Sequence, residues 1–154
     1  MELRPLNESH QDLLLSLQRQ DDVWEFIGTL PVPTAGEAAE AAQAHMFAIT
    51  EGPTSLGFAG LVRSQTIPGN DFELLCAIRA EAQQRGVAKR ACQLVLDWAF
   101  NSAKLERIIA CIDDGNEAAR AIAMKLGMTE LETRQSGRTV YVKYRDERSL
   151  TGAR

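Results

Sequence analysis

The spacing of hydrophobic residues changes near residue 80 from that of strands to that of a helix, and that change limits the folds the chain can adopt. Before it, closely spaced turns separate three strand-like segments, at His45–Thr50, Ser55–Arg63 and Asp71–Arg79. Such segments predict an antiparallel meander. After it, apolar residues recur at helical spacing from about Val87 to Ser102, and a near-continuous apolar run follows at Arg107–Ile112. A helix between two strands favours a parallel pair, so we expect a mixed sheet.

The remaining segments complete an α/β order. The expected elements are a strand at Glu2–Leu6, a helix capped by Asn7 or Ser9 and running to about Gln18, a short helix at Asp21–Ile27, a loop at Gly28–Gly36, a helix capped by Thr34 and running to about Gln43, a helix from Asn116 closed by Gly127, and hairpin strands at Met128–Arg134 and Thr139–Arg145. The predicted order is β-α-α-β-β-β-α-β-α-β-β, with helices on both faces of the sheet.

Length and composition exclude several classes of protein. A chain of 154 residues corresponds to about one domain, which we place at residues 1–147, with 148–154 as a frayed tail. Apolar residues make up 45% and charged residues 25%, which argues against disorder, collagen and coiled coil. The net charge of −4 argues against a nucleic-acid partner. No apolar stretch suggests a membrane span or a signal peptide, so we expect a cytoplasmic protein.

The cysteines and histidines do not predict a metal site. Cys76, Cys92 and Cys111 are widely spaced within apolar runs, and we interpret them as core residues. His10 and His45 each lack a second His or Cys at ligand spacing. We therefore expect no metal. The sequence leaves the oligomeric state open between monomer and homodimer.

The loop between the third meander strand and the long helix contains small residues at two positions. It reads Gln83-Gln84-Arg85-Gly86-Val87-Ala88. Small residues at Gly86 and Ala88 let successive backbone N–H groups approach an anion, and the helix adds its free N–H groups and positive dipole end. Neither the nucleoside-triphosphate loop nor the dinucleotide glycine pattern is present. The loop suits a pyrophosphate, although an ordinary turn before a helix has the same pattern.

The segment from Cys76 to Gly127 carries an ordered set of motifs. It continues ELLCAI with QQRGVAKRA, a long helix, RIIACID and GNEAARAIAMKLGM. This order resembles the Gcn-related N-acetyltransferase (GNAT) superfamily, in which a Gln/Arg-x-x-Gly-x-Gly/Ala loop grips the pyrophosphate of acetyl-coenzyme A and a later Asn opens a helix ending in Lys-Leu-Gly. The opening LRPL and the stretch DDVWEFIG look like the branch that includes ribosomal-protein alanine N-acetyltransferases.

The resemblance implies a fold, a co-substrate and a set of binding residues. The fold is a single GNAT-like domain with a mixed, mostly antiparallel sheet of six to seven strands flanked by about four helices. The co-substrate is acetyl-coenzyme A, whose pantetheine arm lies where one strand splays from its parallel neighbour. The implied binding residues are Cys76, Ala77, Ile78, Gln83, Arg85, Gly86, Val87, Ala88, Lys89 and Asn116. Asn116 is also a plain helix N-cap candidate.

Acetyl transfer to an amine requires a base, because an alkyl ammonium has a pKa of about 10.4 and cannot attack while protonated. A carboxylate can take the proton directly or through a water. Glu73 is the candidate general base, since it lies on the strand leading to the thioester. Glu25 and Asp22 are weaker alternatives. Because side chains on a strand alternate, a register error of one residue would point Glu73 away from the cleft.

The family's usual acid is missing. Many members carry a Tyr four residues before the Gly of Lys-Leu-Gly, and that position is Ala123 here. Tyr141 is a weak candidate substitute, as is Tyr144, and both are also explained as sheet packing. A leaving thiolate can instead take a proton from water, because a thiol pKa is about 8.5.

The acceptor is the least defined part of the site. We expect Trp24, Glu25 and Phe26 near its mouth, either lining a pocket or fixing a helix to the core, together with the hairpin at Gln135–Arg138. The leading hypothesis is direct acetyl transfer to a primary amine, either a protein N-terminus or a small molecule, in a ternary complex. The alternatives are a non-catalytic acyl-coenzyme A-binding module of the same fold, and a protein-interaction domain without a ligand.

Overall fold

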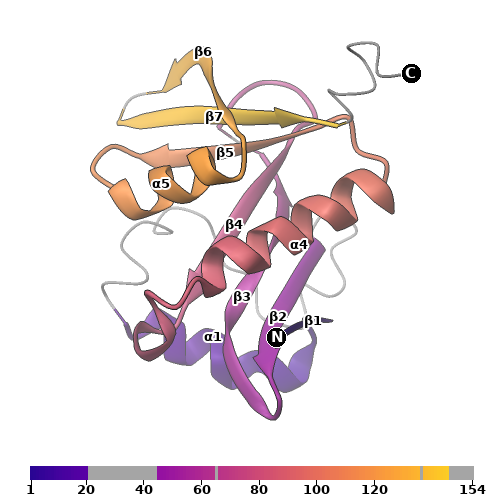
Figure 1. Cartoon of the computed structure of the whole chain (residues 1–154), viewed down its shortest axis with the longest axis vertical. Coiled ribbons are helices and arrows are strands. Elements are labelled where there is room, and N and C mark those ends of the chain that lie inside the picture. Colours follow the sequence, from indigo (N-terminus) through magenta and orange to yellow (C-terminus); the bar gives the residue numbers. More distant parts are fainter. Residues whose placement is uncertain (21–44, 65, 136, 146–154) are drawn as a thin grey trace.

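The computed structural model describes residues 1–20, 45–64, 66–135 and 137–145. These residues form a seven-stranded mixed sheet in the order β1-β2-β3-β4-β5-β7-β6 (Figure 1). The strands are β1 (Glu2–Pro5), β2 (His45–Glu51), β3 (Thr54–Arg63), β4 (Phe72–Ile78), β5 (Arg107–Asp113), β6 (Thr129–Gln135) and β7 (Arg138–Tyr144). The helices are α1 (Gln11–Gln18), α4 (Val87–Asn101) and α5 (Glu117–Lys125), with short 3-10 turns at Glu8–His10 and Ala80–Ala82.

The predicted mixed α/β fold is confirmed, and the strands and α-helices end close to the expected bounds. The N-cap expected at Asn7 or Ser9 is wrong, because α1 begins after His10, which makes no side-chain capping bond. The turn at Ala80–Ala82 was not predicted. The helices expected at Asp21–Ile27 and after Thr34, and the loop at Gly28–Gly36, lie outside the described residues. No helix in the described ranges is both long and apolar enough to cross a membrane.

Strands β4 and β5 form the parallel pair, and they pair only briefly. The register joins Phe72 to Ile108 and Glu73 to Ile109, and no further pairs follow. Beyond Glu73 the two strands separate, which Figure 1 shows as a steep β4 beside a nearly horizontal β5. Every other neighbouring pair in the sheet is antiparallel. The separation leaves one edge of β4 without a strand partner over residues 74–78.

The helices cover opposite faces of the sheet. Helix α4 places a buried apolar stripe against β3 and β4, formed by Val87, Ala91, Cys92, Val95, Leu96 and Ala99. Its period matches an amphipathic helix, so the sequence pattern directly specifies this contact. Helix α5 shares the same core cluster, whereas α1 packs Leu13 and Leu17 against Ala77 and Phe58 on the opposite face.

Close contact between β3 and β4 predicts a large stability effect at Gly57. A Cβ atom there would lie 2.1 Å from the Ala77 carbonyl oxygen and 2.9 Å from the Ile78 Cα. Because backbone cannot swing aside as a flexible side chain can, we expect Gly57→Ala to lower the free energy of unfolding by about 3 kcal/mol. Gly52→Ala is the control, since its Cβ would meet nothing within 4 Å and its positive φ costs only about 1–2 kcal/mol. Equal urea midpoints for the two variants would contradict the packing argument.

Candidate active site

The loop before α4 presents a row of unbonded backbone N–H groups. Gly86 has φ of +75° and Gln84 has φ of +63°, so the chain turns sharply into the helix. The first bond across the start of α4 runs from the Arg90 N–H to the Gly86 carbonyl at 3.2 Å. Within the described residues, the N–H groups of residues 84–89 have no acceptor. Together with the helix dipole, these donors suit an anion with several oxygens.

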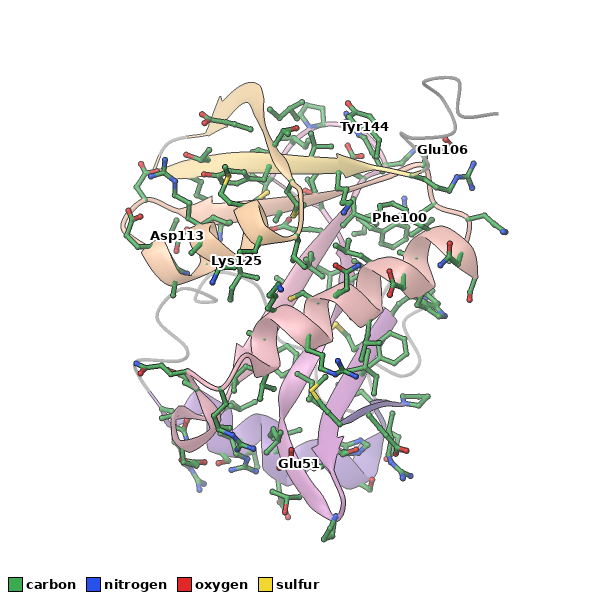
Figure 2. All side chains as sticks on the ribbon, in the orientation of Figure 1. Glu51, Phe100, Glu106, Asp113, Lys125 and Tyr144 are labelled. Carbon is green, nitrogen blue, oxygen red and sulfur yellow. The ribbon has the colours of Figure 1, made fainter. Side chains whose placement is uncertain are left out.

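Among the residues that the structure describes, no side chain covers the tip of this loop. Gly86 is exposed, and nothing lies within 4 Å of the position its Cβ would take. Gln83 donates from Nε2 to the Ile78 carbonyl at 3.0 Å, so its side chain ties the loop to the end of β4. Arg85 forms an exposed ion pair with Glu51 at 3.1 Å (Glu51 is labelled in Figure 2). Val87 is buried in the core and Lys89 is exposed.

The register of β4 determines which main-chain groups face the gap beside β5. The Arg79 N–H bonds to the Leu56 carbonyl at 2.8 Å, and antiparallel bonding alternates along a strand. Ala77 therefore directs its N–H and C=O toward β3, where it is the partner of Phe58. Cys76 and Ile78 direct theirs toward the gap. The expectation that all three residues present main-chain groups there is thus corrected for Ala77.

Asn116 caps α5, as one of its two proposed roles requires. Its Oδ1 accepts from the Ala119 N–H at 3.1 Å. It also lines a cavity of about 330 Å³. That cavity is lined by Ile112, Asp113, Asp114, Gly115, Asn116, Glu117, Arg120, Glu130, Thr139 and Tyr141. Residues 83–89 are not among the residues that line this cavity.

Glu73 lies where β4 and β5 separate, and it is nearly inaccessible, with a relative exposure of 1%. Its side chain is on the sheet face opposite α4, because Phe72, Leu74, Cys76 and Ile78 are the β4 residues that pack in the α4 cluster. Oε2 accepts from the Thr66 hydroxyl at 3.4 Å. Oε1 is buried and has no hydrogen-bond partner among the described residues. A buried carboxylate oxygen without a donor is costly, so this atom is a candidate for a functional role.

Two neighbours of Glu73 were not foreseen as its partners. Cys111 lies beside it, and burial together with the Glu73 charge raises the pKa of the Cys111 thiol to about 12. Arg138 donates to Thr66 Oγ1 at 3.4 Å and to Asp113 Oδ1 at 2.6 Å. Burial lowers the pKa of Arg138, but the Asp113 hydrogen bond and the charges of Asp113 and Glu73 raise it overall. Nothing local in the sequence pairs Arg138 with Glu73; only strand alternation, once the register is known, could find it.

Tyr141 and Ala123 lie on the other face of the sheet from Glu73. Tyr141 has an exposure of 4% and packs in the same core cluster as Ala123. Its β7 neighbours Val140 and Val142 instead pack with Ile109, on the Glu73 face. Tyr144, labelled in Figure 2, lies at the opposite end of the β5–β7 pair from Asp113. The structure therefore does not bring Glu73 and Tyr141 onto one surface.

The cysteine thiols of the site are poorly suited to act as nucleophiles. A hydrogen bond with Cys92 and burial raise the pKa of the Cys76 thiol well above its usual value. Since the thiolate is the reactive form, both Cys76 and Cys111 are held in the unreactive form. Within the described ranges, no group of three His, Cys, Asp or Glu side chains is placed to hold a metal ion. Trp24, Glu25, Phe26 and Asp22 lie outside the described residues.

Comparison with known protein families identifies the class of this chain. The family model described as acetyltransferase (GNAT) domain matches residues 1–129. The chain therefore belongs to the GNAT acetyltransferase family, and it is an acyltransferase of that type. No curated protein sequence matched significantly.

Solved structures share the fold across nearly the whole chain. Spermidine N-acetyltransferase from Vibrio cholerae, in complex with CoA and spermine, superposes with a TM-score of 0.78 at 15% identity, covering 95% of this chain and 96% of that one. Ribosomal-protein-S5-alanine acetyltransferase from Vibrio fischeri gives 0.70 at 16%, covering 94% and 93%. Ribosomal-protein-alanine N-acetyltransferase from Brucella melitensis gives 0.72 at 17%, covering 94% and 99%. At these identities the likeness concerns the fold.

Proposed function

We propose that this protein transfers the acetyl group of acetyl-coenzyme A to a primary amine, by direct attack in a ternary complex. The observation that carries the proposal is the row of N–H groups at residues 84–89, which have no acceptor among the described residues and lie between the end of β4 and the start of α4. A pyrophosphate offers several oxygens to several donors at once, which is what such a row can bind. The exposed Lys89 adds positive charge near the phosphates.

In this mechanism the main chain of β4 positions and polarises the thioester, and the Glu73 carboxylate takes the proton from the amine. Acetyl-coenzyme A supplies an activated thioester. The Cys76 and Ile78 main-chain groups face the gap and align the pantetheine arm as an added strand would, and a free N–H there polarises the thioester carbonyl. Glu73 Oε1 takes the proton of the acceptor amine, directly or through one water, so that the nitrogen lone pair can attack. The acyl group passes to nitrogen without an enzyme-bound ester, because the site thiols stay protonated.

The leaving thiolate needs a proton that Ala123 cannot give. Free thiols have a pKa of about 8.5, so protonation by solvent is fast enough for turnover near neutral pH. Tyr141 stays a weak candidate donor, since it packs beside Ala123 in the core. The acceptor class is a primary amine. The neighbours named for spermidine and for ribosomal-protein alanine suggest testing a polyamine and an alanine N-terminus.

A second candidate function has one observation in its favour. Ala123 is buried at 3% exposure where many relatives carry the catalytic Tyr, which fits a non-catalytic acyl-coenzyme A-binding module of the same fold. Both candidate functions predict binding of acetyl-coenzyme A, but only the acetyltransferase predicts turnover. Tight acetyl-coenzyme A binding without release of free thiol on any amine favours the module.

The first test is binding and turnover. We expect acetyl-coenzyme A to raise the melting temperature, since a ligand at 100 times its Kd stabilises the native state by about 2.7 kcal/mol. With spermidine or a peptide beginning with alanine, we expect free thiol to appear in proportion to acetylated amine. Both are measurable, by differential scanning calorimetry and by a thiol-reactive dye with mass spectrometry. Absence of a melting shift at millimolar acetyl-coenzyme A would refute the assignment of the loop.

A further inference from the structure

The sheet face that carries Glu73 holds three carboxylates and two arginines in one row. Asp71 and Arg107 pair at 2.6 Å at one end, where Tyr144 also contacts Arg107. Asp113 and Arg138 pair at 2.6 Å at the other end. Between them lie Glu73 and the Cys111 thiol, which is neutral because its pKa is raised to about 12. Among the described residues, Glu73 is the carboxylate on this face without an arginine bonded to it.

A chain of hydrogen bonds connects Glu73 to the Asp113–Arg138 pair through Thr66. Arg138 has only donors, so the Thr66 hydroxyl must accept from Nη1 at 3.4 Å. The single Thr66 proton is then directed to Glu73 Oε2, also at 3.4 Å. The Thr66 backbone is held in turn, because its N–H donates to Ser64 Oγ at 3.1 Å. Oε2 is therefore restricted to accepting, and Oε1 is the oxygen left to receive a proton.

We propose that Arg138 and Thr66 are positioning residues for Glu73: the Thr66 hydroxyl orients its carboxylate, and Arg138 bonds that hydroxyl and contributes the positive charge. Asp113 fixes the Arg138 guanidinium, since the two residues are direct partners in the β5–β7 register. Proton capture at Oε1 leaves the Thr66 bond intact, because the carbonyl form of Oε2 still accepts. The inference rests on the proposed function, in which Glu73 is the base.

The test follows the titration of Glu73 itself and needs no acceptor. The full-length protein is labelled with 13C at glutamate side-chain carboxyl groups, and the Glu73 signal is assigned by its absence in Glu73→Gln. In Arg138→Met we expect the Glu73 titration midpoint to rise, because the charges of Arg138 and Glu73 interact and loss of an opposite charge disfavours the ionised carboxyl. Arg138→Lys keeps the charge and should recover most of the difference.

Matched variants separate the charge from structural damage. Arg107→Met removes an arginine from the same face, but Arg107 interacts with Asp71 and Tyr144 and not with Glu73, so the Glu73 midpoint should stay close to wild type. Thr66→Val removes the hydroxyl at nearly constant shape and should raise the midpoint, while Thr66→Ser should restore it. These two variants decide the question if Arg138→Met does not fold. An Arg138→Met or Thr66→Val midpoint equal to wild type would overturn the proposal.

Kinetics show whether Arg138 acts through Glu73. With the most active amine, the acid limb of the kcat/KM profile should move to higher pH in Arg138→Met by the same amount as the titration. In a Glu73→Gln background the same substitution should change kcat little, since the group it acts through is gone. If Arg138→Met lowers kcat by the same factor in the wild-type and Glu73→Gln backgrounds, Arg138 does not act through Glu73 and its positioning role is overturned. Full activity of Glu73→Gln alone would instead refute the assigned base, which leaves the titration result unaffected.

Discussion

Replacing Glu73 with Gln is expected to lower kcat by about 100-fold or more at pH 7, because a positioned general base contributes about two to four orders of magnitude. The amide keeps the shape of the side chain but cannot take the amine proton at Oε1. Binding of acetyl-coenzyme A should be unchanged, since the loop before α4 lies apart from this face. Initial rates of thiol release, with a separate Kd from calorimetry, measure both quantities.

The pH dependence gives this prediction a sign. An alkyl amine loses its proton without help near its pKa of about 10.4. The ratio of the wild-type kcat to the Glu73→Gln kcat should therefore decrease as the pH rises from 7 to 10. A second readout reports the lost charge. Because the Glu73 charge contributes to raising the pKa of Cys111 to about 12, that pKa should fall in the variant. The activity control is Glu106→Gln, which should leave kcat unchanged. Glu106 is an exposed carboxylate and lies far from Asp113, the acid at the Arg138 end of the row (Figure 2). A ratio of the two kcat values that stays constant with pH would show that Glu73 does not act as the general base.

Local patterns predicted the strands and α-helices of the described residues, although not the 3-10 turn at Ala80–Ala82. The apolar stripe of α4 has a helical period, and the run at Arg107–Ile112 is too uniformly apolar for an edge strand, so both were predicted within about one residue. The Gly86 turn was also visible locally, since a small residue directly before an apolar helical stripe predicts a sharp entry. Such features depend on neighbours within one turn or one strand.

Partners from distant segments could not be predicted in the same way. Arg138 was expected only as part of an acceptor hairpin, and its contact with Thr66 spans 72 residues of sequence. The contact exists because β7 pairs with β5 in a register that aligns Asp113 with Arg138, and no local pattern specifies a register between strands separated by a helix. The same limit explains Ala77, whose main-chain direction depends on which β3 residue it faces, and Arg85, whose side chain pairs with Glu51 in another hairpin.

Gly86→Glu is expected to weaken acetyl-coenzyme A binding by at least about 100-fold while the protein stays folded. The substitution places a carboxylate beside the N–H groups of residues 84–89, where it repels the phosphates and competes for the same donors. Each hydrogen bond to a charged group contributes about 1.5–3 kcal/mol, and a tenfold loss corresponds to about 1.4 kcal/mol, so losing two such bonds is enough. Isothermal titration calorimetry measures the Kd.

The positive φ at Gly86 demands a control for backbone strain, because any side chain there costs about 1–2 kcal/mol of stability. Gly137 provides it: its φ is +73° against +75° at Gly86, and at both positions nothing lies within 4 Å of the place that a Cβ atom would take. Gly137→Glu should therefore lose similar stability and bind acetyl-coenzyme A as wild type does. Gly86→Asn, which tolerates this φ and carries no charge, should bind with an intermediate Kd. If Gly86→Glu binds acetyl-coenzyme A with the wild-type Kd, the phosphates do not bind at this loop. The placement of the pantetheine arm along β4 would then be refuted as well.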